Sequence, residues 1–396
     1  MFYPLFLFCI LVLFCLHKYK QPLMAPVSIT FLIWTALIFL YQYLPTNLYP
    51  LTDLFYVILF LFLLFYLLGH IFSIICFGNV TYKNEYYEDE RKLKLSIYFC
   101  ILISLYQIYR YIAIYRSGVN VYIMSVKEGW PTDLRVINYI NVFCIALYFY
   151  ILSKKKKMQR IELLYIFLFT IAIGLRLAKL GVMQLFCGML AVLWIRKKIK
   201  FRHLILLSAI IIVLLFVLTI IREEHAEKGT DLIVNIFAVY ALSPLKAADL
   251  LFNGEVNIGH HRFFGFVFRV LSKLFKINFD FPKEEITNFV YVPVPTNVYT
   301  IMDLIYTDFG LLGTIFYAFL LGLSWGTLYR YKNNPHIYMI YIINIYTIFF
   351  QFFDDIIINY FSVFLQGVIF SWCLLKILKV NCINIERRKI DKQYIK

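Results

Sequence analysis

Residues 54–77 read LFYVILFLFLLFYLLGHIFSIICF, and His70 is the only titratable side chain among them besides two tyrosines and a cysteine. A helix of this length rises about 36 Å, which exceeds the roughly 30 Å hydrocarbon core of a bilayer. Similar apolar runs lie on both sides, so that 62% of the 396 residues are hydrophobic and 16% are charged. Because only helices and closed barrels satisfy the backbone in lipid, the sequence excludes a soluble enzyme and predicts a helical membrane protein.

The apolar runs predict about eleven membrane-spanning helices, because each is long enough for a span and carries few charges. The predicted spans cover residues 2–16, 23–44, 54–77, 95–115, 137–152, 161–178, 182–195, 203–221, 309–329, 337–353 and 356–378. A long loop, 222–308, separates the spans of 1–221 from those of 309–378, and a basic tail, 379–396, follows. We therefore expect an all-α polytopic integral membrane protein.

Positive charge is distributed unevenly between the predicted loops. A net charge of +16 would suggest nucleic-acid binding in a soluble protein. Here Lys and Arg gather in alternate loops, as in 154–157, 196–198 and 387–389, whereas 45–53 contains none. The positive-inside rule places the basic loops and the C-terminus in the cytoplasm and the N-terminus outside. We expect a lipid bilayer around the chain and no nucleic-acid partner.

The eight cysteines indicate neither a disulfide framework nor a metal site. They lie in or beside apolar runs or in the tail, and no pair has C-x-x-C spacing. The chain also lacks an H-E-x-x-H motif, a P-loop, a G-x-S-x-G motif and a dinucleotide-binding glycine pattern. We therefore expect no metal and no cofactor, and neither ATP-driven transport nor serine hydrolysis is supported.

Residues 262–277, RFFGFVFRVLSKLFKI, predict an amphipathic helix within the long loop. At about 100° per residue its basic side chains fall on one side. These are Arg262, Arg269, Lys273 and Lys276, and His261 precedes them. Such a helix is suited to the headgroup plane of a membrane. It serves either as an interfacial anchor or as a cationic shelf for a phosphate-bearing lipid headgroup.

Residues 290–310, VYVPVPTNVYTIMDLIYTDFG, form the second informative part of this loop. Its two prolines favour an extended backbone, after which Thr296 or Asn297 is expected to cap a helix. At helical spacing three side chains would share one face before Asp308 and Gly310 end that helix. They are Tyr299, Asp303 and Tyr306. The N–H groups of the first turn would then form an anion site, although polar residues here can also simply face water.

Several ionisable residues are predicted near the outer membrane surface, where inserting a charge costs about 2.5–3.5 kcal/mol. They are Arg110, Arg176, Lys179, Arg222, Glu223, Glu224, Asp354 and Asp355. Each can reach water from a helix end, but arginine on this side runs against the positive-inside rule. The set therefore favours an anionic ligand at the outer surface.

These features resemble the Wzy-type oligosaccharide repeat-unit polymerases, the O-antigen and capsule polymerase family. The resemblance rests on the tight outer turn with Arg176, the long loop after span 203–221, and the stretch from Thr296-Asn297-Val298-Tyr299-Thr300 to Asp308-Phe309-Gly310. It implies a membrane glycosyltransferase similar to the GT-C class, at the external face of the bacterial cytoplasmic (inner) membrane. Its substrates would be donor and acceptor glycans linked to undecaprenyl diphosphate, and a chain-length regulator and a flippase would be its protein partners.

The implied chemistry suits the charged residues of the outer side. Fixed cations stabilise the charge that grows on a diphosphate leaving group, and Arg binds phosphate in a bidentate manner. The expected substrate-binding residues are Arg176, Arg222, Arg262, Arg269, His261, Asn297, Tyr299 and Tyr306. Asp303, Asp308 or Glu223 is expected to accept the proton of the acceptor hydroxyl.

Three other classes of protein share part of this pattern. An O-antigen ligase has similar spans and one large external loop. A transporter of polysaccharide or lipid-linked sugar would show internal repeats and broken mid-membrane helices, and the sequence indicates neither. A membrane-bound acyltransferase would use a histidine beside a carboxylate, for which His260 and His261 are candidates.

Overall fold

The computed structural model describes most of the chain. The described residues are 1–77, 80–82, 89–119, 121, 124, 129–154, 158–176, 178–199, 203, 238–257, 263–276, 290–293, 295–380 and 385–387.

Helices dominate the described residues, and the strands are short. The α-helices are α1 (Phe2–Lys18), α2 (Pro26–Tyr43), α3 (Asp53–Phe77), α4 (Glu90–Arg116), α6 (Thr132–Ser153), α7 (Arg160–Leu175), α8 (Lys179–Ile195), α11 (Ser243–Phe252), α12 (Gly265–Phe275), α13 (Asp303–Arg330), α14 (Pro335–Asn344), α15 (Tyr346–Phe349), α16 (Ile356–Asn359) and α17 (Phe361–Ile377). A π-helical turn, η1 (Ala238–Leu242), precedes α11, and the strands are β1 (Val80–Tyr82), β2 (Val290–Tyr291), β3 (Pro295–Thr296) and β4 (Ile385–Arg387).

Five of the described helices are long and apolar enough to cross a membrane, namely α2, α3, α4, α6 and α13. Shorter apolar helices cover Phe2–Lys18, Leu180–Ile195, Pro335–Phe349 and Phe361–Ile377. Large apolar side chains such as Phe14 and Phe316 remain about two-thirds exposed, as expected for residues that face lipid. The prediction of an all-α multi-pass membrane protein is confirmed. The span expected at 203–221 lies outside the described residues, apart from His203, so the count of eleven stays a prediction.

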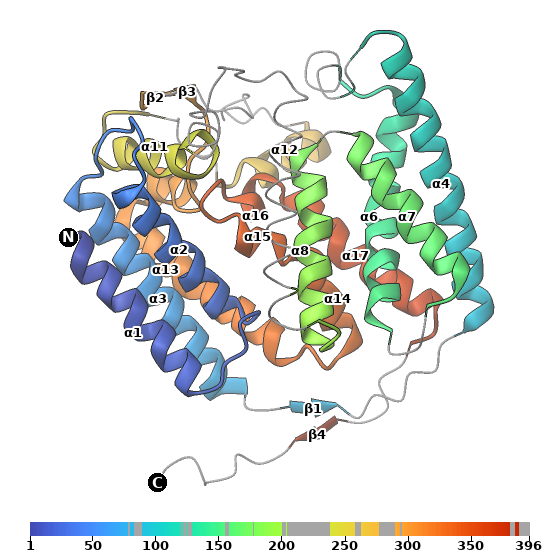
Figure 1. The fold of residues 1–396 in the computed structure, drawn as a ribbon, viewed down its shortest axis with the longest axis horizontal. Helices are drawn as coiled ribbons and strands as arrows, with labels where there is room; N and C mark the ends of the chain where they lie inside the picture. Colours follow the sequence, from blue (N-terminus) through green and yellow to red (C-terminus); the bar gives the residue numbers. More distant parts are fainter. Residues whose placement is uncertain are drawn as a thin grey trace.

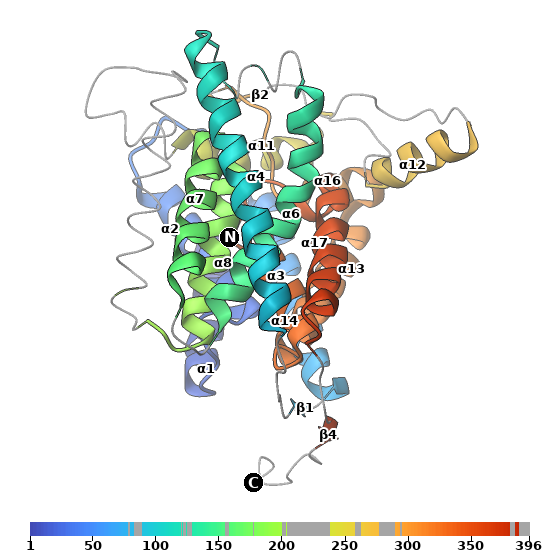
Figure 2. The same ribbon diagram turned by 90° about the vertical axis from the view of Figure 1, so that its right-hand side faces the viewer.

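The helices form two groups joined by a third (Figure 1). Helix α13 packs along α3, beside α1 and α2, while α4 packs against α7 and α6. Helices α8, α14 and α17 connect the groups, since α17 contacts α6 and α14, and α14 contacts α8 and α13. Helix α12 instead extends sideways from the bundle (Figure 2).

Glycines allow α3 and α13 to approach backbone to backbone. A Cβ on Gly69 would overlap the carbonyl oxygen of Phe319, and one on Gly322 would overlap that of Tyr66. Gly326, four residues beyond Gly322, lies against the side chain of Ser73. The G-x-x-x-G spacing in α13 therefore forms the small-residue stripe that membrane helices use for close packing.

The bundle has two chemically different ends. At one, the β1 end, strands β1 and β4 pair with Val80 opposite Arg387, and the Lys198 ammonium donates to the Leu152 carbonyl over 2.7 Å. At the other, the α11 end, lie α11, β2 and β3 (Figure 1). There the Ile301 N–H donates to the Gln351 carbonyl over 2.8 Å. Segments expected on one side of the membrane thus contact each other at the same end.

The expected start of the helix before Gly310 is wrong. The helix expected to be capped by Thr296 or Asn297 begins only at Asp303, because 297–300 continue without helix from strand β3. Tyr299 therefore does not share a helical face with Asp303 and Tyr306. The spans expected at 337–353 and 356–378 overlap the apolar helices Pro335–Phe349 and Phe361–Ile377.

Candidate functional site

The long loop enters the bundle rather than lying wholly outside it. Helix α11 begins with a proline in its first turn, where the missing N–H costs no hydrogen bond. Ser243, Leu245, Ala247 and Ala248 of this helix are fully buried, and α11 contacts α3, α13 and β3. The small side chains let the helix sit close to its neighbours. Helix α11 is thus packed firmly against its neighbours at one end of the bundle.

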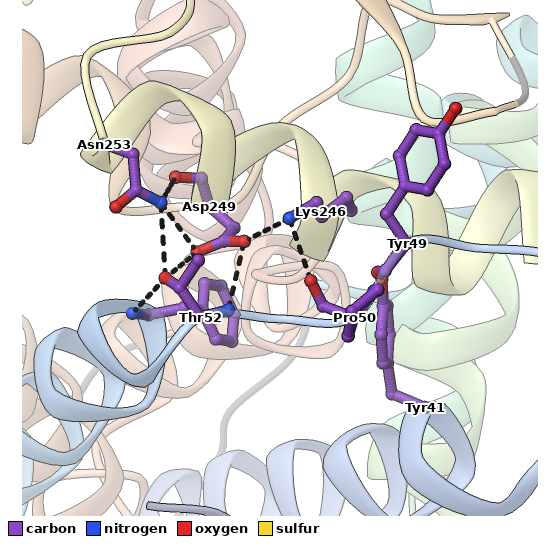
Figure 3. Close-up of polar contacts among 8 residues, drawn as sticks. Tyr41, Tyr49, Pro50, Thr52, Lys246, Asp249 and Asn253 are labelled. Carbon is purple, nitrogen blue, oxygen red and sulfur yellow. Dashed lines mark hydrogen bonds and ion pairs between the residues drawn. The ribbon is translucent and has the colours of Figure 1, made fainter.

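A buried ion pair holds α11 to the loop between α2 and α3 (Figure 3). The Lys246 ammonium lies 2.6 Å from the Asp249 carboxylate and donates to the Pro50 carbonyl over 2.9 Å. Asp249 is fully buried and also accepts from the hydroxyl and the N–H of Thr52. Asn253 completes the cluster by donating to Thr52 and Asp249. Because a buried charge needs both a counter-charge and hydrogen bonds, the cluster fixes α11 in one position.

The segment that precedes α13 contacts α11 through strand β3. Strands β2 and β3 pair in antiparallel fashion, with Val290 opposite Thr296. Tyr299 and Asp303 are each only 2% exposed, and Thr300 is fully buried. The structure gives Tyr299 a packing position instead of an open ring face for a sugar. Asn297 is half-exposed and stays accessible.

Tyr306 and Asp308 connect the first turns of α13 to neighbouring elements. The Tyr306 ring lies 4.6 Å from the Phe252 ring at the end of α11, and its hydroxyl donates to the Phe252 carbonyl over 3.4 Å. Asp308 accepts the N–H of Phe263, just before α12, over 2.8 Å. The Phe263 ring lies 5.8 Å from that of Phe309. This segment therefore joins α11, α12 and α13.

Gly310 separates the segment from the membrane-crossing part of α13. Its φ of 64° and ψ of −158° are not helical, and a side chain at this φ would be strained. The kink redirects the chain, so Asp303 to Asp308 form a short helical piece set off from the rest of α13.

Arg176 lies in a different place, at the ends of α4 and α7 and the start of α6. Its guanidinium stacks over the Trp130 ring at 4.9 Å, and Tyr115 donates to the neighbouring Leu175 carbonyl over 2.7 Å. The buried Nε of Arg176 makes no hydrogen bond to any residue that the structure describes. Trp130 and Leu175 pack around Tyr111, in a cluster separate from the main core that contains Tyr299.

Arg110 and Asp133 form an ion pair near Arg176. The Arg110 Nε lies 2.7 Å from the Asp133 carboxylate, and both side chains are about one-third exposed. The sequence did not indicate a partner for Arg110. In the structure that partner is Asp133. Arg176, in contrast, forms no ion pair with a described carboxylate, which leaves its charge available.

Other predicted site residues fall outside the described residues. Arg222, Glu223, His261 and Arg262 belong to this group. Arg269 lies on α12, whose backbone is described, but its side chain is not. The proposal that these residues meet Arg176 at one diphosphate is therefore untested by the geometry.

Sequence reasoning missed two pairs of polar residues. Lys246 and Asp249 are three residues apart on α11. This spacing favours an ion pair when the segment is helical. Tyr317 and Asp355 are far apart in sequence, yet the Tyr317 hydroxyl donates to Asp355 over 2.7 Å. The sequence places Asp355 only among the ionisable residues near the outer membrane surface, and nothing in it indicates the partner.

Among the described residues, no group of three His, Cys, Asp or Glu side chains could hold a metal ion. The described residues near the start of α13 instead provide the carboxylates of Asp303 and Asp308 and aromatic rings, and Arg176 provides a cation. Cations and aromatic rings suit an anionic, sugar-bearing ligand, and carboxylates can take up a proton.

Fold and site together define a multi-pass helical membrane protein with buried and half-buried polar groups gathered at one end of the bundle. The family model "O-antigen polysaccharide polymerase Wzy" matches residues 1–305 of the 396. The chain therefore belongs to the Wzy family of O-antigen polymerases, which confirms the resemblance seen in the sequence. No curated protein and no solved structure matches the chain.

Proposed function

We propose that the chain joins oligosaccharide repeat units carried on undecaprenyl diphosphate, at the external face of the bacterial cytoplasmic membrane. The family match carries this proposal, because Wzy proteins are O-antigen polymerases. The growing glycan would leave its lipid diphosphate and bond to a hydroxyl of the next lipid-linked unit. The donor is already activated, so the reaction needs no ATP, and we propose that it needs no metal.

The two ends of the bundle support a proposed orientation in the membrane. Lysines and arginines of short segments gather at the β1 end, for example Lys154, Lys198 and Lys379. The positive-inside rule assigns such an end to the cytoplasm. The α11 end and the N-terminus would then be external, where a flipped lipid-linked glycan is accessible.

Arginines would bind the diphosphate. Arg176 is the one whose surroundings the structure shows: its guanidinium lies over the Trp130 ring, and its buried Nε makes no hydrogen bond to a described residue, so a bidentate phosphate contact would satisfy it. Arg222, Arg262 and Arg269 would add charge from the long loop, with His261 beside them. Preorganised cations stabilise the leaving diphosphate without reorganising during the reaction.

Residues of the 296–308 segment would contact the glycan. Asn297 is accessible, and Tyr306 is held in place by Phe252. We propose Asp303 as the base that takes the acceptor proton. Asp308 already accepts the Phe263 N–H, which gives it a holding role, and Glu223 remains a further candidate.

Deletion of the chain followed by gel analysis of surface glycan tests the function. Loss of a polymerase leaves lipid A core bearing one repeat unit. A ligase mutant would instead leave unattached lipid-linked polymer, and a transporter mutant would leave no repeat unit on the surface. Either of the last two patterns would overturn the proposal.

A further inference from the structure

Tyr111 is a buried tyrosine of α4 whose hydroxyl has no partner among the described residues. The residue is only 1% exposed, and its hydroxyl makes no hydrogen bond to any residue that the structure describes. Leaving a buried hydroxyl unpaired costs stability, which a ligand that accepts its proton would recover. The position therefore favours a ligand atom that can accept a hydrogen bond.

Trp130 contacts both Tyr111 and Arg176. The centroids of the Tyr111 and Trp130 rings are 6.4 Å apart, and the guanidinium carbon of Arg176 lies 4.9 Å from the centroid of the same indole ring. The buried Nε of Arg176 also lacks a partner among the described residues. Two unsatisfied donors therefore lie beside one indole ring. Trp130 and Arg176 are half-buried, so a ligand can approach from their exposed side.

Helix α4 also fixes the chain next to Arg176. The Tyr115 hydroxyl, one turn beyond Tyr111, donates to the Leu175 carbonyl over 2.7 Å. Leu175 and Trp130 pack against the cluster that contains Tyr111. The end of α7 is thus held before any ligand binds, and a preorganised cation needs little rearrangement to bind an anion.

The carboxylate nearest in sequence to Trp130 among the described residues, Asp133, is already engaged. It lies 2.7 Å from the Arg110 Nε and accepts the Tyr106 hydroxyl over 2.9 Å. Arg176 forms no ion pair with any carboxylate that the structure describes. A half-buried guanidinium without a counter-charge favours an anionic ligand. The oxygens of a phosphate group can accept from both a guanidinium and a hydroxyl.

We propose that Tyr111, Trp130 and Arg176 form the subsite for one phosphate group of the lipid-linked substrate. The proposal rests on the polymerase function and adds two residues to its site. The Tyr111 hydroxyl and the Arg176 Nε donate to phosphate oxygens. Trp130 is the positioning residue, because its ring holds the guanidinium in place.

The purified full-length chain tests the subsite with undecaprenyl diphosphate, which carries the diphosphate but no sugar, as the probe. Trp130 is one of five tryptophans, and a phosphate bound at Arg176 changes the surroundings of its ring. The probe should therefore change the tryptophan fluorescence of the unaltered chain, and Trp130→Phe should lose most of this change. Tyr111→Phe should bind the probe about tenfold more weakly, because it loses a hydrogen bond to a charged group. Its melting temperature should not fall, since the hydroxyl that it removes has no described partner.

Tyr109→Phe is the matched control, because it removes a hydroxyl from the same helix at a residue that is 66% exposed. It should bind the probe as the unaltered chain does. The subsite is wrong if Tyr111→Phe keeps full affinity or if Trp130→Phe keeps the full fluorescence change. A lower melting temperature of Tyr111→Phe with unchanged affinity would show a purely structural role and would also overturn the proposal.

The polymerase function is tested separately in the same preparation, with lipid-linked repeat units extracted from cells that lack the chain. If the unaltered chain binds the probe as expected but fails to extend these units, the function is wrong and the phosphate subsite stands. If the chain extends them and Tyr111→Phe keeps full affinity for the probe, the function stands and the subsite is wrong.

Discussion

The main-chain N–H of Phe263 donates to the Asp308 carboxylate over 2.8 Å. This hydrogen bond links α12, which extends from the side of the bundle, to the short helical piece before the Gly310 kink. Because α12 exposes apolar side chains such as Leu274 and Phe275, it is suited to the membrane interface. Asp308 therefore couples an interfacial helix to the proposed site.

The first prediction separates the charge of Asp308 from its hydrogen bond. Asp308→Asn keeps an oxygen for the Phe263 N–H, whereas Asp308→Ala removes it. A hydrogen bond to a charged group contributes roughly 1.5–3 kcal/mol, so Asp308→Ala should reduce polymer yield by about tenfold or more. Asp308→Asn should stay within about threefold of the unaltered chain, measured on gels at equal protein level. Equal loss in both variants would instead make the Asp308 charge essential and identify it as the base.

The second prediction concerns the crossing of α3 and α13. Gly322→Ala places a methyl group against the Tyr66 carbonyl, and overpacking of this kind costs about 1–3 kcal/mol. The purified variant should therefore unfold at lower temperature. Gly174→Ala on α7 is the control, because no atom lies within 4 Å of a Cβ there. An unchanged melting temperature for Gly322→Ala would mean that the helices do not approach as closely as described.

The third prediction concerns the buried ion pair of α11. Lys246→Met leaves the Asp249 carboxylate buried without its counter-charge, which typically costs about 3–5 kcal/mol. We expect strong destabilisation in thermal unfolding, and partial recovery in the double variant Lys246→Met with Asp249→Leu. Arg110→Met is the comparison, since the partly exposed pair with Asp133 should contribute only about 0–1 kcal/mol. Equal effects of the two single variants would contradict the buried position of Lys246.

The sequence predicted the long helices well and their connections poorly. Apolar runs such as 54–77 identify a span without any tertiary information, because lipid imposes both length and composition. The start of α13 was missed because Pro295 and Thr296 pair with strand β2 and Ile301 bonds to Gln351, contacts that the local sequence does not indicate. Asp355 and Tyr317 were not paired, since their contact depends on how α13 packs. The G-x-x-x-G spacing of Gly322 and Gly326 was, in contrast, readable from the sequence.

The fourth prediction tests the orientation of the bundle. Reporter fusions at Lys156 and Lys198 should report the cytoplasm, because they lie among the basic segments. A fusion at Gly254, in the turn after α11, should report the exterior. The combination of alkaline phosphatase and a cytoplasm-active reporter distinguishes the two sides at each position. Cytoplasmic signal at Gly254 would invert the orientation and remove access to an external substrate.

The last prediction concerns Arg176, whose guanidinium rests on Trp130 without an ion pair among the described residues. If this cation binds the diphosphate, Arg176→Ala should reduce long polymer by about ten- to a hundredfold, because a charge-assisted hydrogen bond contributes roughly 1.5–3 kcal/mol. Arg176→Lys should recover part of the activity, since it keeps the charge but loses the planar fork.

Arg135→Ala is the matched control for Arg176. Arg135 is an exposed arginine of the same region whose guanidinium, among the described residues, donates to the Trp130 carbonyl, so its loss should leave polymer nearly unchanged. The readout is the length distribution of surface glycan at equal levels of inserted protein. Near-normal polymer in Arg176→Ala would remove this residue from the site, and an equal loss in Arg135→Ala would show that only the overall positive charge of the region matters. A specific loss in Arg176→Ala, with partial recovery in Arg176→Lys, is the result that a diphosphate bound at the Trp130 stack requires.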